Sequence, residues 1–219
     1  MYRFFALLLL CSTACTPVPS KNNASAAQHR QWASELLSIR DLKGATEEMR
    51  LALAGNPNIE DALLYADLLE SQKRYKDARN VYRKAGSYPA DNTQKEALAY
   101  RLAIVEATDL DNLREADKLR EVLPPVDSRY FDLQALLLLK RGDFKEALEA
   151  GEKALVVAAN NEQKGWAYYH LARIYYELRV ERDTFGSLFK AINNTRGHGL
   201  MARITEYWES IRHSPFPTD

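Results

Sequence analysis

Few residues of this sequence have a type and spacing that could do chemistry. The four histidines, His29, His170, His198 and His213, lack the short spacings of metal ligands. The acidic segment 109–112 has neither the glycine nor the closing glutamate of a calcium loop, so we expect a solvated turn there. Phosphate-loop, zinc-protease and hydrolase motifs are also missing from the sequence. We therefore expect no enzyme, no cofactor, no metal site and no small-molecule substrate. An enzyme that uses a non-standard acidic site is the alternative, and loss of turnover on changing one Asp or Glu would support it.

The clearest chemical signal lies near the start of the chain, at Cys15. A basic start at 1–3 precedes an apolar run at 4–11 and three small residues at 12–14, which is the pattern of a secretory signal sequence. The apolar run is too short to span a membrane, which takes about 20 residues. We expect segment 1–14 to be removed, which would leave Cys15 as an unpaired thiol in an oxidising compartment unless it is modified. Plain secretion and a buried N-terminal helix are the alternatives.

The stretch Ser12-Thr13-Ala14-Cys15 resembles the lipobox of bacterial lipoproteins, although Ser12 stands where that family usually has leucine. The resemblance implies that Cys15 is lipidated and anchors the protein to a membrane of the bacterial cell envelope. Because Thr16 rather than aspartate follows the cysteine, it also implies the outer membrane, with the protein facing the periplasm. Segment 15–27 is rich in Pro, Ser and Asn, so we expect the lipidated cysteine to lead into a flexible tether.

The composition bounds the remaining chain. The 219 residues carry 30 Lys+Arg and 30 Asp+Glu, a balance that argues against a nucleic-acid partner. Hydrophobic residues make up 46% of the chain, which is enough for a packed core. Both cysteines lie near the start, so a disulfide framework in the body is excluded.

Local patterns predict helices and no strand. Apolar residues recur at helical spacing, as in Leu64, Leu68 and Leu69, and no alternating β-branched run competes with them. Proline or glycine separates the apolar segments at 57, 89, 124–125 and 142. Three pairs of residues have the spacing of helix N-terminal capping boxes: Thr93 with Glu96, Asp143 with Glu146, and Asn160 with Gln163. The fold class is therefore all-α.

A small residue recurs in every second helix that we expect. These residues are Ala45, Ala78, Ala116, Ala147 and Thr184, at intervals of 33, 38, 31 and 37 residues. An aromatic residue or leucine often stands three positions earlier and an alanine seven positions later, as Phe144 and Ala154 do around Ala147. Small residues let two antiparallel helices approach closely, and a helix pair needs neighbours to bury its apolar face.

This pattern resembles the tetratricopeptide repeat, whose period is about 34 residues. The resemblance implies a right-handed α-solenoid of about five helix pairs over residues 28–196. Residues 197–219 would form a capping helix and tail, because Leu200, Ile204, Tyr207, Trp208 and Ile211 make one apolar stripe that can cover the end of the array.

The resemblance also implies a binding face. In this family the first helices of the pairs line a concave groove that holds a peptide or helix of a partner protein. Ten residues are predicted to face this groove: Arg30, Asp67, Arg101, Arg129, Asp132, Trp166, Tyr169, His170, Arg173 and Tyr176. Tyr169, Arg173 and Tyr176 share one helix face, and Tyr and Arg are enriched in binding hot spots.

The sequence thus predicts a non-enzymatic, lipid-anchored interaction scaffold. It would help assemble an envelope complex for secretion, pilus formation or polysaccharide export, although a pilotin-like Asn-Asn-Tyr-Gly stretch is missing. The alternative is an adaptor that recruits or regulates peptidoglycan hydrolases or synthases. A defect in cell shape on deletion, with secretion and pili intact, would favour the adaptor.

Overall fold

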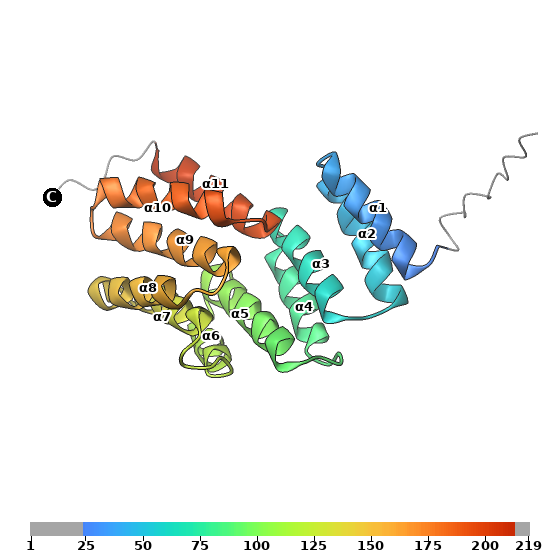
Figure 1. Ribbon diagram of the computed structural model, residues 1–219, viewed down its shortest axis with the longest axis horizontal. Helices are drawn as coiled ribbons and strands as arrows, with labels where there is room; N and C mark the ends of the chain where they lie inside the picture. Colours follow the sequence, from blue (N-terminus) through green and yellow to red (C-terminus); the bar gives the residue numbers. More distant parts are fainter. Residues whose placement is uncertain (1–23, 213–219) are drawn as a thin grey trace, which may run out of the picture.

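The computed structural model describes residues 24–212, which form eleven helices and no strand (Figure 1). In chain order the helices are α1 (Ala26–Ser38), α2 (Leu42–Gly55), α3 (Ile59–Ser71), α4 (Tyr75–Ala85), α5 (Asn92–Thr108), α6 (Leu113–Arg120), α7 (Ser128–Arg141), α8 (Phe144–Val157), α9 (Asn161–Glu177), α10 (Glu181–Asn194) and α11 (His198–Ile211). The first ten helices are five antiparallel pairs, and each pair stacks on the next (Figure 1). The expected all-α solenoid of five helix pairs is confirmed.

The backbone repeats as regularly as the small residues do. Each turn within a pair contains one residue in the left-handed region, and these are Arg40, Lys73, Asp111, Gly142 and Arg179. Each lies five positions before the small residue of the same pair, at 45, 78, 116, 147 and 184. Only at Gly142, with φ of 89°, does the chain supply the residue that adopts this conformation without a steric penalty.

The five small residues form the contacts that the sequence predicts. Ala45, Ala78, Ala116, Ala147 and Thr184 are all 0% exposed. Thr184 fits this site because its hydroxyl donates to the carbonyl of Val180, at 2.9 Å, so that no polar atom is left unpaired. The spacing of small residues in the sequence therefore marks the positions where the two helices of each pair are in close contact.

The predicted helix starts are only partly right. Helix α5 begins with Asp91 and Gln94 as a reciprocal capping box, so the predicted pair of Thr93 and Glu96 is wrong by two positions. Asn160 does cap α9 by accepting from the amide of Gln163, whereas Asp143 precedes α8 without a capping hydrogen bond. Short Asx-type motifs compete within a few residues, and the sequence pattern alone does not choose among them.

The N-terminal boundary also differs slightly from the expected one. Ser25 and Gln28 form a capping box that starts α1 at Ala26, within the segment 15–27 predicted as a tether. The remaining part of that prediction, at 15–23, lies outside the described residues. Between residues 24 and 212 no helix combines the length and apolar character needed to cross a membrane.

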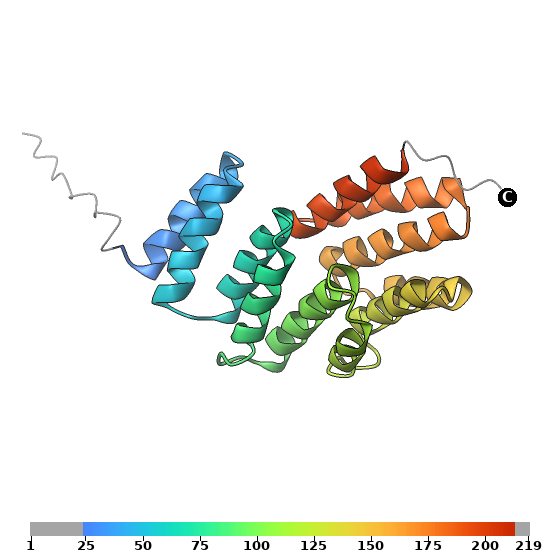
Figure 2. The same ribbon diagram turned by 180° about the vertical axis from the view of Figure 1, so that it is seen from behind.

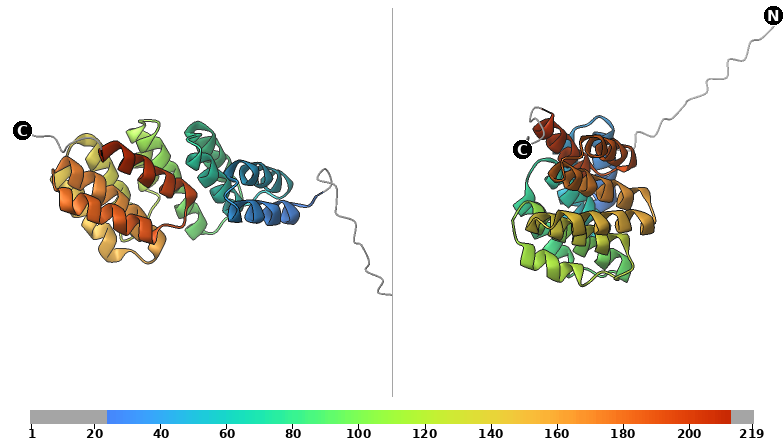
Figure 3. Two further views of the ribbon diagram at one scale, coloured as in Figure 1. Left: turned by 90° about the horizontal axis from the view of Figure 1, so that it is seen from above. Right: turned by 90° about the vertical axis from the view of Figure 1, so that its left-hand side faces the viewer.

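Helix α11 does more than cover the end of the array. It packs on α10 and also reaches back to α3, from which it is separated by more than 100 residues of chain (Figures 1 and 2). The view from above shows α11, in dark red, running from the C-terminal helices to the teal helices of the second pair (Figure 3). Leu200, Ile204 and Ile211 of α11 are buried in the same apolar cluster as Trp166 and Tyr169 of α9. The last helix therefore lies against α3 and α9, each of which is the first helix of its pair.

Candidate functional site

The ten residues predicted for the groove all lie on the first helices of their pairs, and most of them contact a neighbouring first helix. Arg30 of α1 donates to Asp61 of α3 at 2.7 Å. Arg129 of α7 pairs with Glu96 of α5 at 2.8 Å, as well as with Asp127 just before its own helix. The Asp61 and Glu96 partners were not predicted. Polar residues on this side of the array thus join successive repeats, which explains why they recur at about one repeat length.

Three of the predicted residues have almost no exposed surface. Asp132 is 1% exposed, Trp166 is 1% exposed and His170 is 0% exposed. Asp132 accepts from the Tyr100 hydroxyl at 2.6 Å and contacts Nδ1 of His170 at 2.9 Å, so its carboxylate joins α5, α7 and α9, while Nε2 of His170 is buried without a hydrogen-bond partner in the described part of the chain. The prediction that His170 is a surface or groove residue is wrong, since the side chain is buried. The hydrogen bond with Asp132 offsets part of the cost of burying the imidazole.

The expected hot spot on α9 is covered by the protein's own last helix. The ring of Tyr207 on α11 packs edge-on against Tyr169 and against Tyr176, with both centroid distances 6.1 Å. Tyr169 is buried as a result, and Tyr176 and Arg173 are half-buried. Tyr169, Arg173 and Tyr176 do share one face, as predicted, but α11 occupies much of it.

A buried ionic network fixes α11 to the array. Arg203 of α11 pairs with Glu70 of α3 at 2.9 Å and with Asp109, just after α5, at 2.6 Å. Arg101 of α5 joins the network through Glu70 at 3.0 Å and Asp67 at 2.7 Å. The sequence pattern did not reveal this cluster.

Burial alone would raise the pKa of Glu70. Arg101 and Arg203 outweigh that effect, so the pKa is lowered and the carboxylate stays charged. Asp67 also accepts from the backbone amide of His198 at 2.7 Å, which places a negative charge at the first turn of α11. The α3–α11 contact is therefore mainly ionic.

Beside the linker that leads into α11, the concave surface remains open as a pocket of about 500 Å³, which we call the Trp166 pocket. Apolar side chains from three first helices form part of its wall: Leu63 and Leu64 of α3, Ala97 and Tyr100 of α5, and Trp166 of α9. Polar and charged residues complete it: Asp67, Thr93, Arg101, Arg129, Asn160, Glu162, Gln163 and Arg196, with Gly197 beside them. Arg101 stacks over the Trp166 ring at 5.2 Å. Four of the ten predicted residues thus line one open pocket.

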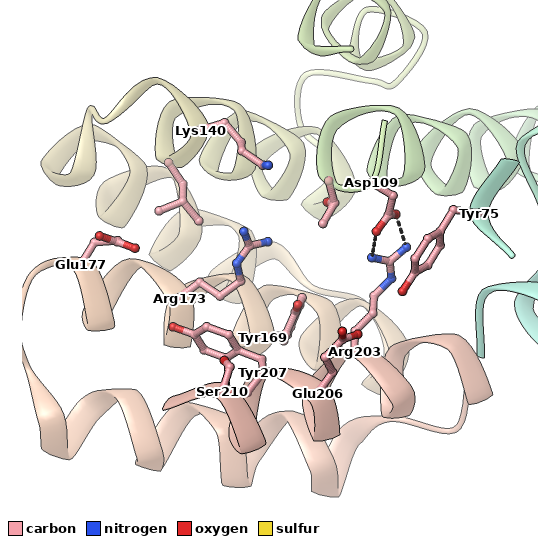
Figure 4. Close-up of a pocket in the computed structure, with 12 residues that line it drawn as sticks. Tyr75, Asp109, Lys140, Tyr169, Arg173, Glu177, Arg203, Glu206, Tyr207 and Ser210 are labelled. Carbon is pink, nitrogen blue, oxygen red and sulfur yellow. Dashed lines mark hydrogen bonds and ion pairs between the residues drawn. The ribbon is translucent and has the colours of Figure 1, made fainter. Parts of the chain in front are cut away.

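A second pocket, of about 560 Å³, lies against α11, and we call it the Arg173 pocket (Figure 4). Its lining comes from the ends of α5, α7 and α9, from Tyr75, and from α11. Burial raises the pKa of Tyr207, although nearby Arg173 opposes the shift, so the hydroxyl remains protonated and able to donate. Tyr169 and Arg173, two of the predicted groove residues, line this second pocket, but the pocket itself was not predicted because α11 forms one of its walls.

Within the described chain, no cluster of three or more His, Cys, Asp or Glu side chains has the arrangement of a metal site. Cys15, the predicted lipidation site, lies outside the described residues. The arrangement on this face is suited to binding, since two open pockets of different polarity lie on it beside ion pairs that join the helices.

The fold defines the class of protein as a helical-repeat solenoid, and comparison with solved structures narrows the class. A chain of the APC/C hetero-tetramer Cut9–Hcn1 matches with a TM-score of 0.60 at 14% identity, over 86% of this chain. This chain spans only 37% of that one. PilW, a widely conserved type IV pilus biogenesis factor, matches with a TM-score of 0.54 at 18% identity, over 85% of this chain and 87% of PilW. MamA matches with a TM-score of 0.51 at 17% identity, over 88% and 98%.

The chain thus has the tetratricopeptide-repeat fold, as its repeats predicted. Comparison of the sequence with family models and with curated proteins found no match. The likeness to these solved structures is therefore one of fold alone.

Proposed function

We propose that this protein is a non-enzymatic interaction scaffold whose Trp166 pocket holds a segment of a partner protein. The observation that carries the proposal is the pocket itself, an open part of the concave surface with apolar side chains beside arginines. Solenoids of this kind use their extended concave surfaces for binding. The pocket favours a segment that inserts an apolar side chain near an acidic one, because the exposed Arg196 lies among the lining residues.

We further propose that lipidation of Cys15 holds the scaffold at the outer membrane, facing the periplasm, where it helps assemble a component of an envelope complex. The leader and the lipobox-like stretch support the address. The shared fold with a type IV pilus biogenesis factor is compatible with a role in envelope assembly. A Cys15→Ser variant is expected to lose fatty-acid labelling and to leave the membrane fraction. Retention of both properties would contradict the anchor.

The pocket is tested by filling it without removing any packing. In an Ala97→Gln variant a longer neutral side chain would occupy the space beside Trp166. Crosslinking of the membrane-bound protein followed by mass spectrometry should identify a partner with the unmodified chain, and Ala97→Gln should reduce its recovery. Ala54→Gln is the matched control, because Ala54 is an exposed alanine on α2 away from the pocket. Equal recovery with both variants would reject this pocket as the binding site.

A further inference from the structure

The Arg173 pocket contains cations that no residue of the structure neutralises. Arg203 and Asp109 pair with each other in its wall, and Glu206 pairs with Lys73 at 2.8 Å. Throughout residues 24–212, no acidic side chain forms an ion pair with the two remaining cations, Arg173 of α9 and Lys140 of α7. Figure 4 shows both side chains reaching into the same space from facing helices.

One acidic residue remains in the lining, and it does not fill this role. Glu177 is exposed at the end of α9 and makes no ion pair with Arg173 or Lys140. Figure 4 shows its carboxylate away from both cations, at the far side of the pocket. Arg173 and Lys140 thus line the pocket without an ion-pair partner among the described residues, although the lining as a whole contains acids and bases in equal number.

The same pocket contains hydrogen-bonding atoms without partners. Nη1 of Arg173, the hydroxyl of Tyr207 and the hydroxyl of Thr108 are buried, and none has a hydrogen-bond partner. They come from α9, α11 and α5, and each can donate a hydrogen bond. An unsatisfied buried polar group costs about 1–3 kcal/mol, so three in one pocket indicate a missing acceptor.

We propose that the Arg173 pocket binds an oxyanion, a carboxylate or a phosphate group, held by Arg173 and Lys140 with donors from Tyr207 and Thr108. An oxyanion has several acceptor oxygens around one charge, which matches unpaired donors of the described chain that line one pocket from different helices. A bound oxyanion would bridge α11 to α5, α7 and α9. It would therefore stabilise the docked position of α11, and the site is independent of the Trp166 pocket.

The test uses the full-length protein, with inorganic phosphate and glutarate as the two probes. Isothermal titration in a constant chloride background should show saturable binding of at least one probe, and the same probe should raise the melting temperature. Binding of phosphate alone would assign the site to phosphate groups, and binding of glutarate alone would assign it to carboxylates. Absence of saturable binding by both probes would overturn the proposal.

Variants separate ligand binding from a structural role. Arg173→Gln and Lys140→Gln should each weaken binding by roughly tenfold or more, as expected for a lost charged hydrogen bond. Tyr207→Phe should weaken binding several-fold while leaving the melting temperature of the free protein unchanged, because its hydroxyl bonds to nothing in the structure. Arg114→Gln, at an exposed position of α6, is the control and should bind as the unmodified protein does. Equal affinity in all four variants would also reject the site.

Discussion

Replacing Arg203 with methionine should release α11 from α3. The substitution keeps much of the aliphatic volume but removes a guanidinium that is only 4% exposed and pairs with two carboxylates. Removing one partner of a buried ion pair costs about 3–5 kcal/mol, because a charge is left without compensation. Glu70 keeps Arg101 at 3.0 Å and the Tyr82 hydroxyl at 2.6 Å, whereas Asp109 loses its arginine, so we expect a value near the lower end, about 3 kcal/mol.

Lys73 provides the matched control, because it connects the same two parts of the molecule through an exposed ion pair. Its side chain is 63% exposed and that of Glu206 is 52% exposed. Exposed pairs of this kind contribute about 0–1 kcal/mol, so Lys73→Met should change the stability by about 0.5 kcal/mol or less. The two variants therefore contrast a buried cation that pairs with two carboxylates and an exposed one that pairs with one.

The assay is native-state hydrogen exchange of the α11 amides, which gives the free energy of opening that helix, together with urea unfolding for the whole chain. Arg203→Met should lower the opening free energy of α11 by about 3 kcal/mol, and adding Asp109→Asn should recover part of the loss by removing the stranded charge. If Arg203→Met and Lys73→Met have the same small effect, the ionic network does not hold α11, and the reasoning fails.

Three other predictions concern Gly142 in the turn between α7 and α8, and Gly199 and Glu70 in the α3–α11 contact. Gly142→Ala should lower the free energy of unfolding, measured in urea, by about 1 kcal/mol. The loss comes only from backbone strain, because φ is positive at this position and a Cβ would meet nothing within 4 Å. Gly199→Ala should loosen the α3–α11 contact by up to about 2 kcal/mol in hydrogen exchange, since the new Cβ would lie 2.9 Å from an Asp67 oxygen that is held by Arg101. Because the pKa of Glu70 is lowered in the folded state, its contribution is present above its unfolded pKa of about 4.3 and is lost as the pH falls below that value. The difference in urea stability between the unmodified protein and Glu70→Gln should therefore shrink on acidification, and a constant difference would contradict the assignment.

The repeat architecture could be predicted from sequence because its cause is local and periodic. A position such as Ala147 must be small wherever two antiparallel helices touch, so the requirement is written into each repeat separately. Thr184 shows that the rule concerns volume rather than residue type, since a threonine with its hydroxyl bonded to the backbone fits equally well. The helix start at Asp91 was missed because two overlapping cap signals differ only in local backbone geometry.

The candidate site was predicted in position but not in environment. Residues such as Asp132 were placed on the correct helix faces, yet a single repeat does not show that its neighbour supplies a partner for them. The position of α11 could not be predicted, because it depends on the curvature accumulated over several repeats. One signal was present in the sequence: Arg203 lies between Leu200 and Tyr207 on the apolar stripe of the last helix. A charge on a buried face requires a buried partner of opposite sign.

The return of α11 changes how this array is held together. In a simple solenoid each repeat contacts only its neighbours, so stability is a sum of local terms. Here α11 joins the second pair to the last one, and Arg203 and Arg101 share the carboxylate of Glu70. Helices α3 to α11 therefore form a closed loop of contacts, whereas α1 and α2 join the array mainly through α3 (Figure 1). The Arg173 pocket is lined by α11 and the Trp166 pocket by the linker before it, so a ligand in either pocket would contact the helix or linker that closes this loop.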